Sequence, residues 1–196
     1  MHDKPDPTRR MLLSAMAGLT LANVPLSAAA PGPNAVRNNS RSLVAYFSRS
    51  GNTRVIAGVI HRQLKTDLFE IEPAAPYPAD YFQTVEQAKN QRENGIRPAL
   101  KNSIADIDRY QTVYLGFPIW GTSIPPVVQT FLASHSLAGK LLIPFITHGG
   151  FGLGDSEDVL AALAPAARRD KPLVMECDQE RRTTETVNGW LEAVRS

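Results

Sequence analysis

The 196-residue sequence contains a single cysteine, and this scarcity excludes two kinds of site. With Cys177 alone, the chain can form no intrachain disulfide and no cluster of thiolate ligands around a metal. We therefore expect no metal site of that kind. We interpret Cys177 as a small structural residue in preference to a nucleophile.

An excess of charge of one sign is also missing. The 21 lysines and arginines nearly balance the 19 aspartates and glutamates, which gives a formal net charge of +2. Because there is no basic stretch with interleaved aromatic residues, nothing predicts binding to nucleic acid or to an anionic membrane surface. The length suits one domain, and a hydrophobic fraction of 43% is enough for a packed core.

The N-terminal residues are typical of an export signal. Residues 1–10 are polar and end in Arg9-Arg10, an apolar stretch follows at 11–22, and small residues stand at 28–30. That stretch is shorter than the roughly 20 residues that span a bilayer, so we expect no membrane span after removal of the leader. The arginine pair resembles a twin-arginine (Tat) signal, with a Sec signal or an uncleaved anchor as alternatives. We predict a signal peptide at 1–30 and a periplasmic or otherwise exported protein.

After a polar segment at 31–41 that we interpret as a linker, residues 42–196 alternate between apolar runs and helical patterns. This alternation is typical of βα units on a parallel sheet with helices on both faces. Strands are predicted at 43–48, 67–71, 112–117, 141–147 and 172–176, and helices at 53–65, 80–91, 123–134, 156–163 and 184–194. Ser123 is the expected N-cap of the third helix, and Asp155 that of the fourth. Pro144 is unexpected inside a central strand because proline cannot donate a backbone hydrogen bond.

Helical spacing predicts which side chains are buried in the first and last helices. In the first helix the residues that share an apolar face are Val55, Ile56, Val59, Ile60 and Leu64. In the last helix they are Val187, Trp190, Leu191 and Val194.

The loop that follows the first strand favours phosphate binding. In an open parallel sheet, ligands bind beyond the carboxyl ends of the strands. Gly51 permits a tight turn in this loop, and Ser48, Ser50 and Thr53 offer hydroxyl groups beside a helix N-terminus. The loop is neither the G-x-x-x-x-G-K-[ST] loop of nucleoside triphosphatases nor the G-x-G-x-x-G loop of dinucleotide folds. An ordinary strand-to-helix turn with a polar cap is the alternative.

Two further loops follow the third and fourth strands. The first of them carries Trp120 behind Pro118, where a large aromatic ring can stack on a planar ligand or close the edge of the core. The second, at 147–155, has four glycines within six positions, so its backbone N–H groups can approach a ligand closely. His148 can add charge there or serve a structural purpose.

Together these three loops resemble the FMN loops of the flavodoxin family, in the family's order, and the resemblance covers about residues 42–196. It implies a doubly wound five-stranded parallel sheet of order 2-1-3-4-5 that binds FMN. The implied cofactor-binding residues are Ser48, Arg49, Ser50, Gly51, Asn52, Thr53, Pro118, Ile119, Trp120, Gly121, Thr147, His148, Gly149, Gly150, Phe151 and Gly152. Of these, Ser48, Ser50, Asn52 and Thr53 are expected to hold the phosphate, residues 118–121 to flank the isoalloxazine, and residues 147–152 to line its polar edge.

What the resemblance implies about function is electron transfer in which no side chain is catalytic, because the cofactor carries out the redox chemistry. A backbone carbonyl of the turn at 120–121 is expected to accept a hydrogen bond from the flavin. The expected partner is a redox protein or a small-molecule electron acceptor. The alternatives are an FMN-dependent NAD(P)H or quinone oxidoreductase and a flavodoxin-fold binding module without cofactor. The near-neutral charge of the domain and Gly121, where relatives often carry a second aromatic residue, depart from the family's pattern.

Overall fold

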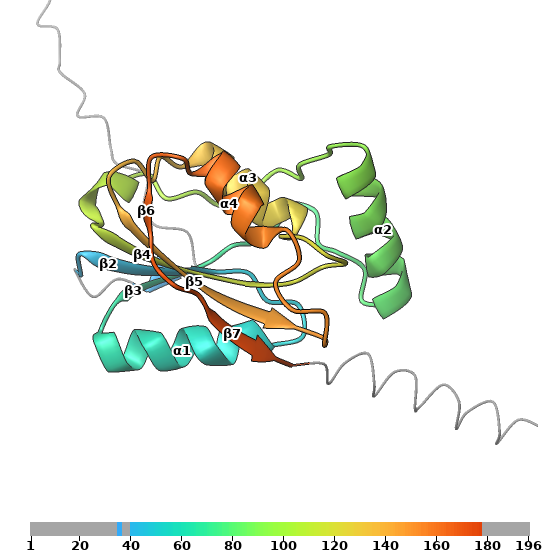
Figure 1. The fold of residues 1–196 in the computed structure, drawn as a ribbon, viewed down its shortest axis with the longest axis horizontal. Coiled ribbons are helices and arrows are strands. Elements are labelled where there is room, and N and C mark those ends of the chain that lie inside the picture. The colour runs from blue at the N-terminus through green and yellow to red at the C-terminus, as the bar shows by residue number, and fades with distance from the viewer. Residues whose placement is uncertain (1–34, 37–39, 178–196) are drawn as a thin grey trace, which may run out of the picture.

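The computed structural model describes residues 35–36 and 40–177 and contains one sheet with helices on both faces (Figure 1). The strands follow the order β1-β3-β2-β4-β5-β6, and β7 also pairs with β5. All pairings are parallel except that of β1 with β3. The strands are β1 (Ala35–Val36), β2 (Ser42–Tyr46), β3 (Asp67–Glu70), β4 (Thr112–Pro118), β5 (Leu141–His148), β6 (Arg168–Arg169) and β7 (Leu173–Glu176).

Four α-helices connect the described strands. They are α1 (Asn52–Leu64), α2 (Tyr81–Glu93), α3 (Pro126–Ser134) and α4 (Ser156–Leu163), with a 3₁₀ turn at Ile107–Arg109. Helix α1 covers one face of the sheet, α3 and α4 cover the other, and α2 extends past the edge at which β5 and β7 end (Figure 1). The predicted order 2-1-3-4-5 is confirmed when β6 and β7 are counted as one interrupted fifth strand. No helix among the described residues has the length and apolar character needed to cross a membrane.

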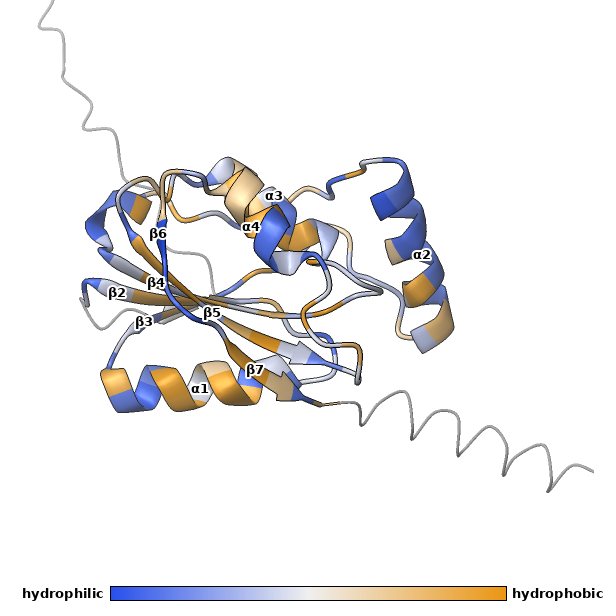
Figure 2. Cartoon of the chain, viewed as in Figure 1, coloured by the Kyte–Doolittle hydropathy of each residue, from blue (hydrophilic) through white to orange (hydrophobic). Residues whose placement is uncertain are grey.

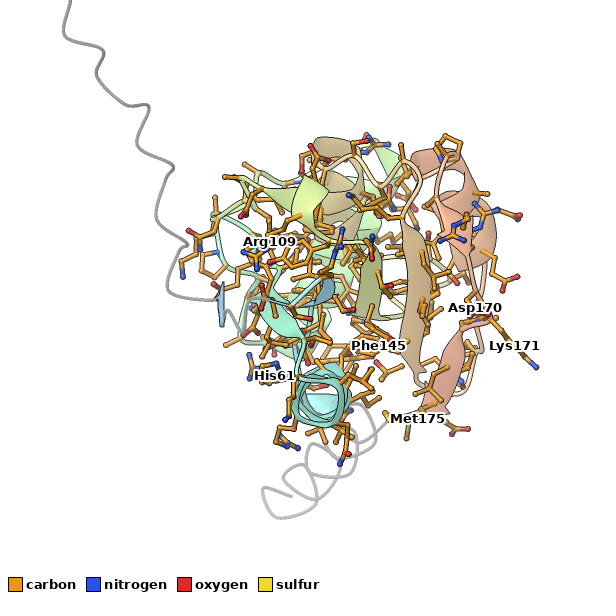
Figure 3. The ribbon with its side chains drawn as sticks, turned by 90° about the vertical axis from the view of Figure 1, so that its left-hand side faces the viewer. His61, Arg109, Phe145, Asp170, Lys171 and Met175 are labelled. Carbon is orange, nitrogen blue, oxygen red and sulfur yellow. The ribbon has the colours of Figure 1, made fainter. Side chains whose placement is uncertain are left out.

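The central strands are apolar on both faces because each face is covered. In β2, Leu43 and Ala45 belong to the large core cluster that includes α3, whereas Val44 and Tyr46 pack with Ala57 of α1. Phe145 lies in the smaller cluster, between β5 and α1 (Figure 3). The middle of β5 is orange in Figure 2, which fits this two-sided burial, and its carboxyl end is paler and more polar.

Pro144 is accommodated because the outer strand is interrupted beside it. The carbonyls of Leu142 and His148 accept hydrogen bonds from Asp170 and Cys177, so even-numbered residues of β5 direct their backbone groups toward the outer strand. The backbone nitrogen of Pro144 therefore also faces that strand. The outer strand gains one residue between Arg169, which pairs with Leu142, and Leu173, which pairs with Phe145. This bulge puts the missing donor of the proline where no ladder hydrogen bond is required.

Three details differ from the sequence-based expectations. Helix α3 begins at Pro126 with Pro125 as its N-cap, and not with Ser123, because the backbone of Ser123 pairs with Trp120 in a tight turn. Two residues of the expected linker, Ala35–Val36, form a strand antiparallel to β3. Asp155 does occupy the N-cap of α4, but its side chain makes no capping hydrogen bond. The helix predicted at 184–194 lies outside the described residues.

The predicted buried face of α1 is too wide. Ile56 and Ile60 pack against the sheet, but Val55, Val59 and Leu64 are exposed by 66%, 46% and 53%. A helix that covers one face of a sheet buries only the stripe directed at the strands, and these three side chains lie beside that stripe.

Candidate functional site

The loops after β2, β4 and β5 meet at the carboxyl edge of the sheet and surround a cavity of about 250 Å³. This volume lies near the lower end of the roughly 300–1,000 Å³ usual for small-molecule sites. The residues that line it are Arg49, Ser50, Asn52, Thr53, Tyr81, Thr84, Val85, Pro118, Ile119, Trp120, Gly121, Thr147, His148, Gly149, Phe151 and Cys177. Of the predicted site residues, Ser48, Gly51, Gly150 and Gly152 do not line the cavity.

The first loop presents the N-terminus of α1 to the cavity. Gly51 is the N-cap, with φ of 94°, and it has no side chain that could satisfy the first N–H groups of the helix. The Ser48 hydroxyl instead accepts the Gly51 N–H at 3.2 Å, which closes the turn. A helix N-terminus without a side-chain cap is suited to bind an anion.

A hydroxyl pair joins the first loop to the third. Thr53 Oγ1 lies 2.9 Å from Thr147 Oγ1, and both side chains are buried. Asn52 Nδ2 also donates to the carbonyl of Cys177 at 3.1 Å, which links the start of α1 to the end of β7. The N-terminal end of α1 is therefore fixed against both β5 and the outer strand.

Arg49 points away from the loop's hydroxyl groups and toward α2. Its Nη2 donates to the carbonyl of Ala79 at 2.8 Å, its Nε donates to Thr84 Oγ1 at 3.3 Å, and its guanidinium lies 5.8 Å from the Tyr81 ring centroid. Arg49 thus connects the first loop to the N-terminus of α2.

The second loop holds Trp120 between two other aromatic rings. The Trp120 ring meets Phe47 edge-on at 5.1 Å and Tyr77 edge-on at 4.8 Å, as measured between ring centroids. Trp120 is half-buried, and it both packs on the core and lines the cavity. Trp120 therefore closes the edge of the core, as one of the two interpretations from the sequence expected, and it also offers an aromatic surface to the cavity. Stacking on a ligand stays a prediction.

Backbone contacts fix the second loop to the third. The Ile119 N–H donates to the carbonyl of Thr147 at 2.7 Å, and the Asp155 N–H donates to that of Thr122 at 2.9 Å. Gly154 allows this approach, because a Cβ at that position would lie within 1.8 Å of the Thr122 carbonyl oxygen. The glycine is needed for contact between two loops and not only for its own turn.

In the third loop, the Nδ1 atom of His148 accepts the Gly150 N–H at 3.1 Å, and the same side chain lines the cavity. The neighbouring Phe151 is 74% exposed at the rim of the cavity.

The sequence reasoning missed four residues that line the cavity. Tyr81, Thr84 and Val85 come from α2, and Cys177 follows β7. The proline-rich segment before α2 gave no signal of where that helix would lie. Burial and the nearby Glu176 raise the pKa of the Cys177 thiol, so it stays protonated at neutral pH, which agrees with a structural role. Within the described residues no group of three or more His, Cys, Asp or Glu side chains is arranged to hold a metal.

Comparisons with known proteins agree with this geometry. A sequence profile described as flavodoxin matches residues 41–194. The chain is 30% identical to a candidate flavoprotein from Bacteroides eggerthii, over 79% of this chain and 98% of that one, with a TM-score of 0.63. It is 31% identical to a second from Bacteroides uniformis, over 77% and 97% of the two chains, again with a TM-score of 0.63.

A flavoprotein from Lactobacillus acidophilus, solved in complex with FMN, shares the fold. It is 22% identical over 72% of this chain and 96% of its own, with a TM-score of 0.58. None of the curated protein sequences matches the chain.

Substitution of Gly154 by alanine is expected to lower the melting temperature far more than the same change at Gly152. Both glycines have positive φ, 54° and 69°, so an alanine is strained at either position. Only at Gly154 would the new Cβ also collide with the Thr122 carbonyl, whereas nothing lies within 4 Å of a Cβ at Gly152. Thermal unfolding followed by circular dichroism compares the two variants, and equal losses would contradict the proposed contact between the loops.

Proposed function

Because the chain belongs to the flavodoxin family, we propose that it binds FMN in the cavity at the carboxyl edge of the sheet and transfers electrons outside the cytoplasm. The observation that carries this proposal is the presence at one cavity of a helix N-terminus without a side-chain cap and of a half-buried tryptophan. FMN combines a phosphate with a planar ring system, so it requires both features.

The donors and surfaces at the cavity fit this group. The first-turn N–H groups of α1, with the hydroxyls of Ser50 and Thr53, match a phosphate that carries two negative charges. The face of Trp120 beside Pro118 suits a planar aromatic ring. The FMN complex of the Lactobacillus acidophilus flavoprotein, which has the same fold, adds support.

When bound, FMN would supply the redox chemistry, and the side chains of this protein would bind and orient it. Thr53 would keep its hydroxyl directed at the phosphate through the contact with Thr147. The ring of Trp120, fixed by Phe47 and Tyr77, would hold the flavin and exclude water from one side. In this proposal no side chain acts as acid, base or nucleophile.

The proposed place of action rests on the N-terminal sequence. Arg9-Arg10 before an apolar stretch is the order of a Tat signal, and the Tat route carries folded proteins that already contain their cofactor. FMN is made in the cytoplasm, so export after loading would explain how the protein acquires it. The proposed partner is a redox protein or a small electron acceptor.

Purified protein is expected to bind FMN one to one, with quenching of flavin fluorescence. Thr53→Val should weaken binding by about tenfold, as expected for the loss of a hydrogen bond to a charged group. Thr112→Val makes the same chemical change at the start of β4, the end of that strand far from the cavity, and should leave FMN affinity unchanged. A wild-type chain that does not bind FMN at micromolar concentration would refute the proposal.

Stopped-flow mixing with NADPH distinguishes a carrier from a reductase. We expect the flavin absorbance of the loaded protein to stay in the oxidised form with NADPH, and to bleach after addition of dithionite. Rapid bleaching by NADPH would instead support an FMN-dependent oxidoreductase.

Replacement of Arg9 and Arg10 together by lysine should stop export by the Tat route, because that route recognises the arginine pair. Immunoblots of cell fractions should then find the variant, with its leader uncleaved, in the cytoplasm. Lys4→Arg is the matched control, because it changes a basic residue of the same polar segment and should be exported normally. Normal export of the double variant would exclude the Tat route.

A further inference from the structure

Helix α2 reaches the second loop through the side chain of Arg92. This residue stands in the last turn of α2, and its Nη1 donates to the carbonyl oxygen of Trp120 at 3.4 Å. Trp120 and Gly121 line the cavity, whereas Arg92 is not among the lining residues. Arg92 therefore contacts the backbone of the ring-binding loop without itself lining the cavity.

The backbone of the turn leaves room for this guanidinium. Gly121 has φ of 65°, and a Cβ on it would lie 2.8 Å from Arg92 Nη1 and 3.3 Å from Arg92 Cζ. The guanidinium thus occupies the space that any side chain at position 121 would need. Glycine at this position serves two purposes, because it permits the positive φ and admits the arginine.

The Trp120 carbonyl that Arg92 contacts is already part of the turn. It accepts the Ser123 N–H at 3.3 Å, while the Trp120 N–H donates to the carbonyl of Ser123 at 3.0 Å. A backbone carbonyl of the turn at 120–121 is expected to accept a hydrogen bond from the flavin. The two donors to the Trp120 carbonyl in the structure come from the protein itself, so its direction is set before any ligand binds.

The C-terminal end of α2 is held firmly enough to position Arg92. The adjacent Gln91 is buried, and its Oε1 accepts the hydroxyl of Tyr77 at 3.0 Å. Tyr77 is the ring that packs edge-on against Trp120. Gln91 therefore holds the ring that packs on Trp120, and Arg92 contacts the Trp120 backbone.

The charge of Arg92 lies against a backbone carbonyl and not against a carboxylate of the described residues. Among the described residues no carboxylate pairs with it, although Lys89 of the preceding helical turn pairs with Glu93 at 3.9 Å. A full positive charge thus lies against the peptide of the residue whose ring faces the cavity.

From these contacts we propose that Arg92 is a positioning residue of the FMN site, which fixes the Trp120–Gly121 turn and raises the midpoint potential of the bound flavin. The inference rests on the proposed FMN site. Reduction adds negative charge to a bound flavin, and a fixed cation beside its loop stabilises that charge. The fixed turn should separately strengthen FMN binding, because a preorganised loop loses less conformational entropy when the ligand binds.

The test compares three variants of the full chain. Arg92→Gln removes the charge, and Arg92→Lys keeps it without the planar donor group. Lys89→Gln removes an equal charge from the same helix, at a residue that pairs with Glu93. Hydrogen exchange of the Ser123 amide in the FMN-free protein reports on the turn. Potentiometric titration and fluorescence titration of the loaded protein give its midpoint potential and FMN affinity.

We expect Arg92→Gln to speed exchange of the Ser123 amide by roughly fivefold, the factor for about 1 kcal/mol of lost hydrogen bonding. It should also weaken FMN binding several-fold and shift the midpoint potential downward. Arg92→Lys should restore most of the potential but not the slow exchange. Lys89→Gln should change neither exchange nor affinity and should shift the potential less.

A fourth variant tests the same contact without removing the arginine. Gly121→Ala should displace the guanidinium, so its effect on amide exchange should be smaller in the Arg92→Gln background than in the wild type. The strain of alanine at positive φ is present in both backgrounds and cancels in this comparison. Additive effects would show that position 121 does not act through Arg92.

The outcomes separate this inference from the proposed function. If the wild type binds no FMN, the proposed function fails, and the inference that rests on it fails as well. This holds even if amide exchange shows that Arg92 contacts the turn. If the wild type binds FMN but Arg92→Gln matches Lys89→Gln in potential and exchange, the inference alone is overturned. Faster exchange with an unchanged potential would overturn the role in redox tuning.

Discussion

The pairing of β5 with its two neighbours determines where every loop of the site lies. One edge of β5 follows β4 in register from Leu141 to Thr147, and the other pairs first with β6 and then with β7. The end of β5 is therefore in contact with three segments. Ile119 binds its carbonyl at Thr147, Thr53 meets the Thr147 hydroxyl, and Cys177 donates to the carbonyl of His148. A shift of this strand by one residue would move all three contacts together.

The irregular outer strand follows from the same constraint. Proline at position 144 removes one donor from the edge of β5, and the bulge between Arg169 and Leu173 accommodates that loss. Asp170 and Lys171 lie within this bulge, at the outer edge of the sheet (Figure 3). Beyond the bulge the parallel pairing with β5 resumes, shifted by one residue. This pairing brings Cys177 to the cavity and to Asn52. A residue that conflicts with the strand pattern in the sequence thus helps to place one wall of the site.

The sequence was sufficient for what depends on local pattern and chain order. Alternating apolar runs and helical spacing located β2, β3, β4, β5, β7 and α4, and the three loops after β2, β4 and β5 supplied most of the cavity lining. Features that depend on tertiary contact were not predictable from it. Serine is a residue type favoured at N-caps, but the backbone of Ser123 pairs with Trp120, and the helix starts at Pro126 instead. Val55 was predicted to be buried but is exposed, because its burial depends on which side of α1 faces the sheet.

The position of α2 was the most consequential feature that the sequence did not reveal. Its low apolar content and the prolines before it suggest a surface helix, and its exposed Phe82 and Val85 fit that description. Yet an arginine near each end joins it to a loop of the cavity: Arg49 reaches its first turn, and Arg92 reaches the turn after β4.

Because both loops contact α2 through guanidinium groups, the helix contributes to the shape of a site that the three loops would otherwise form alone. A helix attached in this way can influence the shape of the cavity without being buried in the core. Arg49 joins the loop at the N-terminus of α1 to the start of α2, and Arg92 joins the turn that carries Trp120 to its end. The proposed ligand, with both a phosphate and a ring, would have to fit the distance between these two loops.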